Sequence, residues 1–183
     1  MLITTRGYRA TTVADIGNNA DVHVDTIYEL VGRKPELLRE LIERAISGTD
    51  RALLPAERGY VKEMRAEPDP ARKLAMYAGA VCDIQTRMAP LLLALRDAAT
   101  TDDEAQQVWR EISDRRARNM RELVRDLGPA GTLRTGLSID EAADFVWATA
   151  SAELFVLLTN ERGWTLEAYE RWLAETWSRH LLV

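Results

Sequence analysis

The chain has 183 residues, 46% hydrophobic and 29% charged, a composition typical of a folded globular protein and not of a disordered or collagen-like one. Its one cysteine excludes an internal disulfide and a cysteine-based zinc cluster, and its two histidines, His23 and His180, lack metal-ligand spacing, so we expect no metal and no cofactor. The 24 basic and 29 acidic residues give a formal net charge of -5, which excludes a uniformly basic coat for nucleic acid but not a local patch.

Apolar residues recur at helical and not at alternating spacing along the whole chain, which predicts an all-α fold. Proline and glycine punctuate this pattern and delimit expected helices at residues 12–20, 23–31, 35–47, 70–89, 90–99, 102–127, 139–160 and 166–182. The segment 49–67, with Pro55, Gly59 and many charges, is expected to connect an N-terminal module to a larger C-terminal bundle. No run approaches the roughly 18 apolar residues that cross a bilayer, and no signal peptide is recognised, so we expect a cytoplasmic protein with no membrane segment.

The apolar positions of the N-terminal module predict two short helices joined by a tight turn. These positions are Val13, Ile16, Ala20, Val22, Ile27 and Leu30. A helix-turn-helix needs a small residue where the second helix crosses the first, and Gly17 supplies it. It also needs a turn residue that tolerates positive φ, and Asp21 is acceptable there, though poorer than glycine. The spacing therefore indicates a helix-turn-helix.

Three segments of this module are more specific than the bare pattern: residues 7–16 (GYRATTVADI), 22–28 (VHVDTIY) and 32–38 (GRKPELL). Together they resemble the tetracycline-repressor (TetR) family of transcription regulators over residues 7–46. The segment 146–182 also resembles the last two helices of some actinobacterial members. The resemblance implies a helix-turn-helix DNA-binding domain at residues 1–48, its first helix truncated to residues 1–6, and a C-terminal ligand-binding and dimerisation domain at residues 49–183.

The resemblance also implies a homodimer that places two recognition helices in successive major grooves of a palindromic double-stranded DNA operator. A small molecule, largely apolar by the composition of the bundle, would release it. By motif position the DNA-binding residues would be Thr12, His23, Val24, Asp25, Thr26, Tyr28 and Lys34, since helix N-termini, hydroxyls and a lysine pair with phosphates and exposed positions of the recognition helix reach bases. Alternatively, Tyr28 packs on helix ends, Lys34 is a solvated charge, and Asp25 interacts with the helix dipole.

The C-terminal bundle carries large, adaptable apolar side chains that are suited to a ligand pocket. We expect the pocket to be lined by Met76, Tyr77, Cys82, Met88, Trp109, Ile112, Met120 and Phe145. The same stripe is also what a close-packed core requires, and the sequence does not separate the two interpretations.

Residues 145–158 are apolar almost all round, with Glu153 as the one charge, which is typical of a helix covered on both sides. Burial of such a helix favours a twofold four-helix interface. The expected interface residues are Trp147, Glu153, Leu154, Tyr169, Trp172, Leu173 and Trp177. Glu153 is either a paired carboxylate of the interface or a polar group facing the pocket.

The sequence thus predicts a ligand-responsive DNA-binding regulator, by resemblance a repressor. The alternative is a dimeric helical ligand-binding or interaction module that has lost DNA binding. Residues 1–50 hold six Lys/Arg and eight Asp/Glu, an unfavourable balance for a polyanion. An enzyme is not expected, because no Ser/His/Asp grouping, phosphate loop or paired Glu-x-x-His is found.

Overall fold

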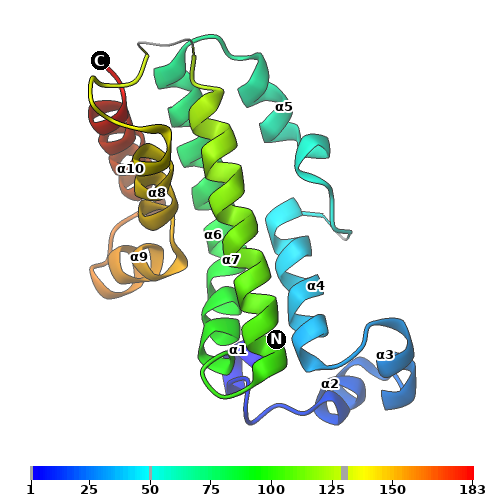
Figure 1. The fold of residues 1–183 in the computed structure, drawn as a ribbon. Helices are drawn as coiled ribbons and strands as arrows, with labels where there is room; N and C mark the ends of the chain where they lie inside the picture. Colours follow the sequence, from blue (N-terminus) through cyan, green and yellow to red (C-terminus); the bar gives the residue numbers. More distant parts are fainter. Residues whose placement is uncertain (1, 50, 129–131) are drawn as a thin grey trace. The chain divides into compact units, whose positions relative to one another are not determined.

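The computed structural model describes residues 2–49, 51–128 and 132–183, and this part of the chain is all-α (Figure 1). The elements in chain order are α1 (Leu2–Arg6), α2 (Val13–Ala20), α3 (Val24–Leu30), α4 (Lys34–Ser47), η1 (Pro55–Glu57), α5 (Gly59–Ala66), α6 (Pro70–Ala98), α7 (Asp103–Arg125), α8 (Ile139–Thr149), α9 (Ala152–Val156), the π-helical turn η2 (Leu157–Glu161) and α10 (Leu166–Leu181). The described residues form no strand, only one isolated bridge between Leu133 and Leu182. The predicted fold class is confirmed.

The helices pack into two compact units. Unit 1 comprises Met1–Ala52 and Arg87–Ile112, and unit 2 comprises Leu53–Thr86 and Ser113–Val183. Both α6 and α7 contribute residues to each unit, so no single cut in the sequence separates them. The division into residues 1–48 and 49–183 concerns function and stays a prediction.

In unit 1, α1, α4 and the adjoining ends of α6 and α7 supply a shared apolar core. Its most deeply buried side chains are Ile3, Leu38, Ile42, Leu92, Leu95 and Ile112. The sequence pattern predicts a helix break at Pro90, but α6 is one helix of 29 residues with Pro90 inside it. Pro90 removes one backbone hydrogen bond. The helix continues because Met88 and Leu92, on either side of this proline, are buried in the core.

In unit 2, the apolar segment predicted as a single helix over 139–160 is divided. Helix α8 ends at Thr149, and Ser151 begins α9 by accepting a hydrogen bond from the Leu154 amide at 3.3 Å. A serine in this position competes with helix continuation because its side chain caps the next turn. The break leaves backbone carbonyl groups of α8 without their helical partners.

Two polar side chains donate to the carbonyl group of Ala150, the residue that caps the C-terminus of α8. The Gln85 amide donates to the Ala150 carbonyl at 2.7 Å, and the Arg116 guanidinium donates to the same oxygen at 3.2 Å. Arg116 also lies over the Trp147 ring, 5.5 Å from its centroid. Burial lowers the pKa of Arg116. Arg116 is thus a half-buried arginine of α7 that binds backbone at the α8 to α9 break.

Among the described residues, no single helix is long and apolar enough to cross a membrane; only the pair Ile139–Thr149 and Ala152–Glu161, bent by 42° at its break, meets the length and composition test.

Candidate nucleic-acid interface and ligand cavity

Helices α2 and α3 form the predicted helix-turn-helix in unit 1. A Cβ atom placed on Gly17 would lie 2.7 Å from the Val22 carbonyl oxygen, so the two segments approach more closely here than any other residue type allows. The turn residue Asp21 has φ of 54°, the only positive value among described non-glycine residues. Ile27 of α3 packs into this crossing and is buried. Gly17 and Asp21 thus play the roles that the spacing predicts.

The side chains of the expected DNA-contacting edge lie mostly at the surface. Thr12, His23, Asp25, Thr26 and Tyr28 are exposed, and Val24 is half-buried. Tyr28 is 49% exposed, so part of its side chain is accessible. It also borders a hollow with Thr12 and Lys34, at the N-termini of α2 and α4, so base contact and packing on helix ends both stay predictions. His23 begins α3 without a side-chain cap, and its Nδ1 lies 3.4 Å from the Asp25 carboxylate. The edge is accessible, and its contact with bases stays a prediction.

Thr12 forms a capping box with Asp15 at the start of α2. Its hydroxyl accepts from the Asp15 amide at 3.0 Å, and the Asp15 carboxylate accepts from the Thr12 amide at 2.8 Å. The Thr12 hydroxyl also donates to the Asp15 carboxylate at 2.7 Å. This bond and the one from the Thr12 amide hold the pKa of Asp15 below its usual value. The hydroxyl expected to face a phosphate therefore also fixes the N-terminus of α2, through the Thr-x-x-Asp pattern of a capping box.

Lys34 is not a solvated charge. Its Nζ donates to the carbonyl oxygens of Tyr8 at 2.8 Å and Thr11 at 2.9 Å and lies 3.8 Å from the centroid of the Tyr8 ring. Burial lowers the pKa of Lys34. The lysine ties the segment before α2 to the N-terminus of α4, and any phosphate contact would use what remains of its donor capacity.

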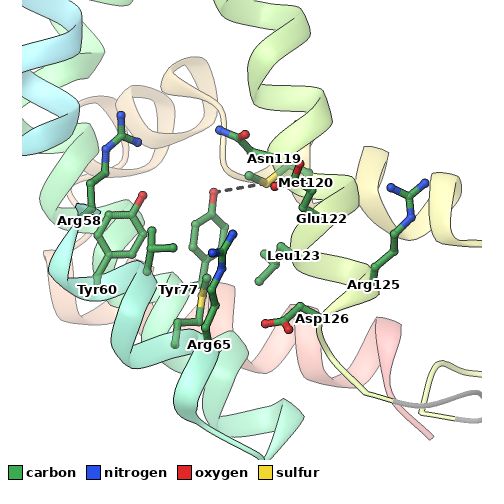
Figure 2. Close-up of a pocket in the computed structure, with 12 residues that line it drawn as sticks. Arg58, Tyr60, Arg65, Tyr77, Asn119, Met120, Glu122, Leu123, Arg125 and Asp126 are labelled. Atoms are coloured by element: carbon green, nitrogen blue, oxygen red, sulfur yellow. Dashed lines mark hydrogen bonds between the residues drawn. The ribbon is translucent and has the colours of Figure 1, made fainter. Parts of the chain in front are cut away.

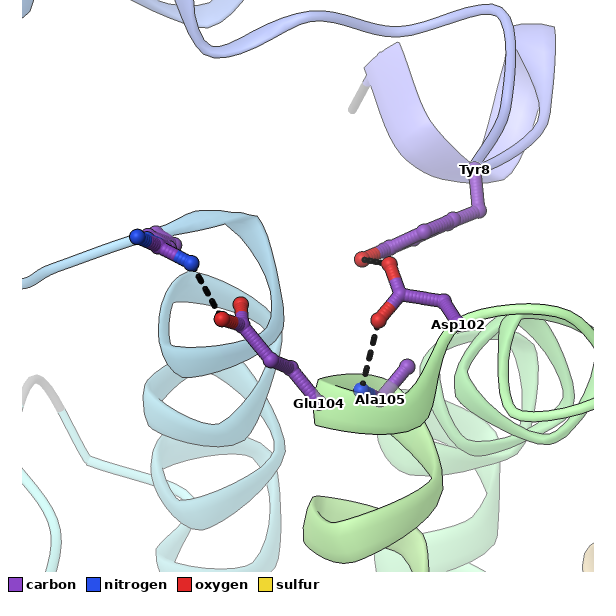
Figure 3. Close-up of polar contacts among 5 residues, drawn as sticks. Tyr8, Asp102, Glu104 and Ala105 are labelled. Atoms are coloured by element: carbon purple, nitrogen blue, oxygen red, sulfur yellow. Dashed lines mark hydrogen bonds and ion pairs between the residues drawn. The ribbon is translucent and has the colours of Figure 1, made fainter.

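The turn between α6 and α7 and the first residues of α7 supply acidic partners to residues on either side of the helix-turn-helix (Figure 3). The Tyr8 hydroxyl donates to the Asp102 carboxylate at 3.3 Å, whose other oxygen accepts from the Ala105 amide at 3.0 Å. Burial and the Asp102 charge raise the pKa of Tyr8. Arg33, the residue before α4, forms an ion pair with Glu104. Arg33, a cation next to the candidate DNA-binding edge, is thus already paired with a carboxylate.

Three apolar residues of the module, Ala20, Val22 and Leu30, are more exposed than their spacing predicts. Leu30 is 79% exposed and Val22 is 40% exposed, whereas Val13 and Ile27 are buried. Helices α2 and α3 have only eight and seven residues, so their single crossing covers the side chains next to Gly17 and not those toward the ends.

Unit 2 contains a cavity of about 560 Å³ between α5, α6 and α7 (Figure 2). It is lined by Arg58, Tyr60, Val61, Met64, Arg65, Tyr77, Asn119, Met120, Glu122, Leu123, Arg125 and Asp126. Its volume lies within the range of about 300–1,000 Å³ that is usual for small-molecule sites. Tyr77 points its hydroxyl toward the Met120 sulfur, 3.3 Å away.

Only part of the predicted pocket lines this cavity. Tyr77 and Met120 do so; the others do not, namely Met76, Cys82, Met88, Trp109, Ile112 and Phe145. Met88, Trp109 and Ile112 belong to unit 1. Phe145 stacks on His180 at 3.9 Å between ring centroids, and the Cys82 thiol donates to the Leu166 carbonyl at 3.8 Å. Cys82, Met88 and Ile112 are buried, which fits the core interpretation, whereas Met76, Trp109 and Phe145 are half-buried. Periodicity does not tell which buried face borders a void.

Sequence reasoning missed one wall of the cavity. Residues of α5 and its cap lie in the segment that the sequence assigns to a connection, yet Val61 and Met64 are buried there. The three-residue step between these apolar positions, with Tyr60 beside them, was the available signal. Charged neighbours and Gly59 obscured it.

Three residues expected at a dimer interface are core residues instead. Tyr169, Leu173 and Trp177 are fully buried within the single chain, so a partner could remove no further area from water. The Tyr169 hydroxyl donates to the Thr149 carbonyl at 3.2 Å, and the Trp177 indole donates to the Thr149 hydroxyl at 2.7 Å. The other four candidates, Trp147, Glu153, Leu154 and Trp172, are half-buried and stay predictions.

The described residues hold no cluster of three His, Cys, Asp or Glu side chains that could bind a metal ion. No family model and no curated protein matches the sequence.

Several solved structures, however, share the fold. A protein from Saccharomonospora viridis, described as a transcriptional regulator in complex with choline, has a TM-score of 0.71 at 19% identity, covering 100% of this chain and 92% of the other. A TetR-family regulator from Rhodococcus sp. has a TM-score of 0.70 at 15% identity, with coverage of 95% and 89%. The ketosteroid transcriptional regulator KstR2 of Mycobacterium tuberculosis has a TM-score of 0.61 at 16% identity, with coverage of 100% and 90%. The chain therefore has the fold of the TetR-type transcriptional regulators.

Proposed function

We propose that the chain is a ligand-responsive, DNA-binding transcriptional regulator that acts as a homodimeric repressor on a palindromic operator. The observation that carries the proposal is the close crossing of α2 and α3 at Gly17, which leaves Thr26 and Tyr28 of α3 exposed. The fold shared with TetR-type regulators supports it. Residues early in a recognition helix reach base edges in the major groove, and these two positions fit that role.

The effector would be a small, largely apolar molecule bound in the cavity of unit 2. Helices α6 and α7 supply residues to this cavity and also continue into unit 1. There, Asp102 and Glu104 contact Tyr8 and Arg33, on either side of the helix-turn-helix, so these two helices would couple the effector to it. A dimer places its recognition helices in successive major grooves only at a separation of about 34 Å. An effector that changes this separation would release the operator.

The homodimer would form through the last helices of unit 2. After Tyr169, Leu173 and Trp177 are assigned to the core, exposed apolar side chains still remain nearby in sequence, namely Leu157, Trp164 and Leu166. A partner that covers them would remove this apolar surface from water, which is the usual driving force of association.

The test is selection of sequences from a random duplex library by the purified chain at low salt, followed by anisotropy titrations. We expect enrichment of an inverted repeat whose half-sites are about 10 base pairs apart. Tyr28→Ala or Thr26→Ala should weaken the selected complex by about 5- to 150-fold, the range of a lost base contact. Thr135→Ala, at an exposed position in unit 2, is the control and should leave it unchanged. Absence of any enriched sequence would refute the proposal.

A second candidate function is a dimeric ligand-binding module that does not bind DNA. It is favoured by the excess of eight acidic over six basic residues in positions 1–50 and by the Arg33 to Glu104 ion pair. Such a field opposes the counterion release that drives DNA binding. Ligand binding in the cavity together with no sequence-preferring complex would establish this alternative.

A further inference from the structure

We propose that the cavity between α5, α6 and α7 takes an amphipathic anion: an apolar body that carries a carboxylate. This inference rests on the ligand-responsive role proposed above and names the chemical class of the effector. It is carried by the charges, the hydrogen-bond donors and the apolar floor of the cavity.

The lining holds more cations than anions, and one of the anions already has a cationic partner outside the lining. The cations are Arg58, Arg65 and Arg125, and the anions are Glu122 and Asp126. The Asp126 carboxylate is already held by the Lys73 ammonium at 2.8 Å, and that lysine side chain is only 5% exposed. The charge of Asp126 is therefore balanced, and the Arg58 guanidinium already donates to the Leu53 carbonyl at 3.0 Å, which leaves Arg65 and Arg125 against Glu122. This excess of positive charge favours an anionic ligand.

Hydrogen-bond donors also outnumber acceptors. The Tyr77 hydroxyl donates only to the Met120 thioether within the described part of the chain, and a thioether is a weak acceptor. An oxygen of a ligand would be a better acceptor for this proton. Burial raises the pKa of Tyr77, so the hydroxyl stays protonated and keeps its donor. Figure 2 places Tyr77 between Arg58 on one side of the view and Arg125 on the other.

The remainder of the lining is apolar. Val61, Met64, Leu123 and Met120 are buried side chains that face the cavity, and the two methionines adapt to varied shapes. A volume of about 560 Å³ admits a molecule of more than a few carbon atoms. An apolar tail on this floor would leave the carboxylate to the tyrosine and arginine donors.

This chemistry differs from what suits a quaternary ammonium ion. Such cations favour the faces of aromatic rings that are free of competing positive charge. Tyr60 and Tyr77 provide rings here, but the guanidinium groups of the lining repel a cation. We therefore expect this cavity to discriminate against ligands of that type.

The test compares three probes with the same ten-carbon tail: decanoate, decanol and decyltrimethylammonium, each below its micelle concentration. Each is titrated into the purified full chain by isothermal titration calorimetry. We expect decanoate to bind most tightly, and at least about tenfold more tightly than the ammonium probe, a ratio that corresponds to about 1.4 kcal/mol. Equal or tighter binding of the ammonium probe, or no binding of any probe, would overturn the proposal.

Variants tie the preference to named groups. Tyr77→Phe and Arg65→Gln should each weaken decanoate binding about tenfold, as expected for a lost hydrogen bond to a charged group, and leave decanol less affected. Arg65 is exposed, so its substitution does not endanger folding. Arg118→Gln, also exposed but outside the lining, is the matched control and should bind decanoate as the native chain does. If neither variant differs from the control, the assignment of the cavity is wrong.

DNA binding is measured separately, so that the two proposals fail independently. Decanoate binding without any DNA complex would refute the proposal of a DNA-binding regulator and would support the proposal of an anion site. A sequence-preferring DNA complex without decanoate binding would refute only the anion site.

Discussion

Replacement of Gly17 by alanine tests whether the close crossing of α2 and α3 is required. In an isolated helix this change is favourable by about 1 kcal/mol. In the structure the new Cβ would lie 2.7 Å from the Val22 carbonyl oxygen, about 0.7 Å inside the ordinary contact distance. This oxygen cannot retreat freely, because the Val22 amide is itself bound to the Gly17 carbonyl at 2.9 Å.

The steric term should exceed the helix-propensity term. Overpacking of this kind costs about 1–3 kcal/mol, and here it falls on backbone rather than on a flexible side chain. We expect a net loss of about 1–2 kcal/mol in the free energy of unfolding, or a fall of about 2–8 °C in Tm for a chain of this size. Hydrogen exchange of the α2 and α3 amides should accelerate.

Gly59→Ala is the matched control. Gly59 lies in α5, has no positive φ, and a Cβ there would meet nothing within 4 Å. The substitution should be neutral or stabilise by up to about 1 kcal/mol. Chemical and thermal denaturation, followed by circular dichroism, measure both variants. If Gly17→Ala proves as stable as Gly59→Ala, the crossing is not close and the helix-turn-helix geometry is refuted.

Three further predictions concern single contacts. Glu104→Gln frees Arg33 and should steepen the slope of log K against log salt for DNA binding by about 0.9. Since both side chains are exposed, the free energy of unfolding should change by less than about 1 kcal/mol. An unchanged slope would contradict the role of the ion pair. Ser138→Ala removes the capping box of α8 and should destabilise by about 1 kcal/mol in urea denaturation. The Ser138 hydrogen bonds lower the pKa of Glu141, so their contribution to the free energy of unfolding is present above the unfolded pKa of Glu141 and is lost as pH falls through its folded pKa. Denaturation at a series of acidic pH values should therefore show a free energy of unfolding that depends less on pH in the variant. Burial raises the pKa of Cys82 to about 12, so a thiol reagent at pH 8 should label the native chain at least about 100-fold more slowly than the unfolded chain, and comparable rates would show that the thiol is accessible.

Local features of this protein were determined by the sequence itself. The helical period of its apolar residues dictates an all-α chain, and Gly17 and Asp21 mark the crossing and the turn because few residue types tolerate those backbone constraints. Exposure along α3 also follows from the pattern, as Thr26 and Tyr28 show.

Tertiary structure decided which helices continue and which apolar faces meet. Pro90 lies within α6 because the core on both sides of it outweighs one lost hydrogen bond, whereas Ser151 divides the apolar segment of α8 and α9 because its hydroxyl caps a new turn. Trp177 and Tyr77 have the same periodic pattern in sequence, yet Trp177 is a core residue and Tyr77 lines a cavity. Periodicity identifies a buried face, but only the packing of distant segments determines whether that face meets another helix, a partner subunit or a void.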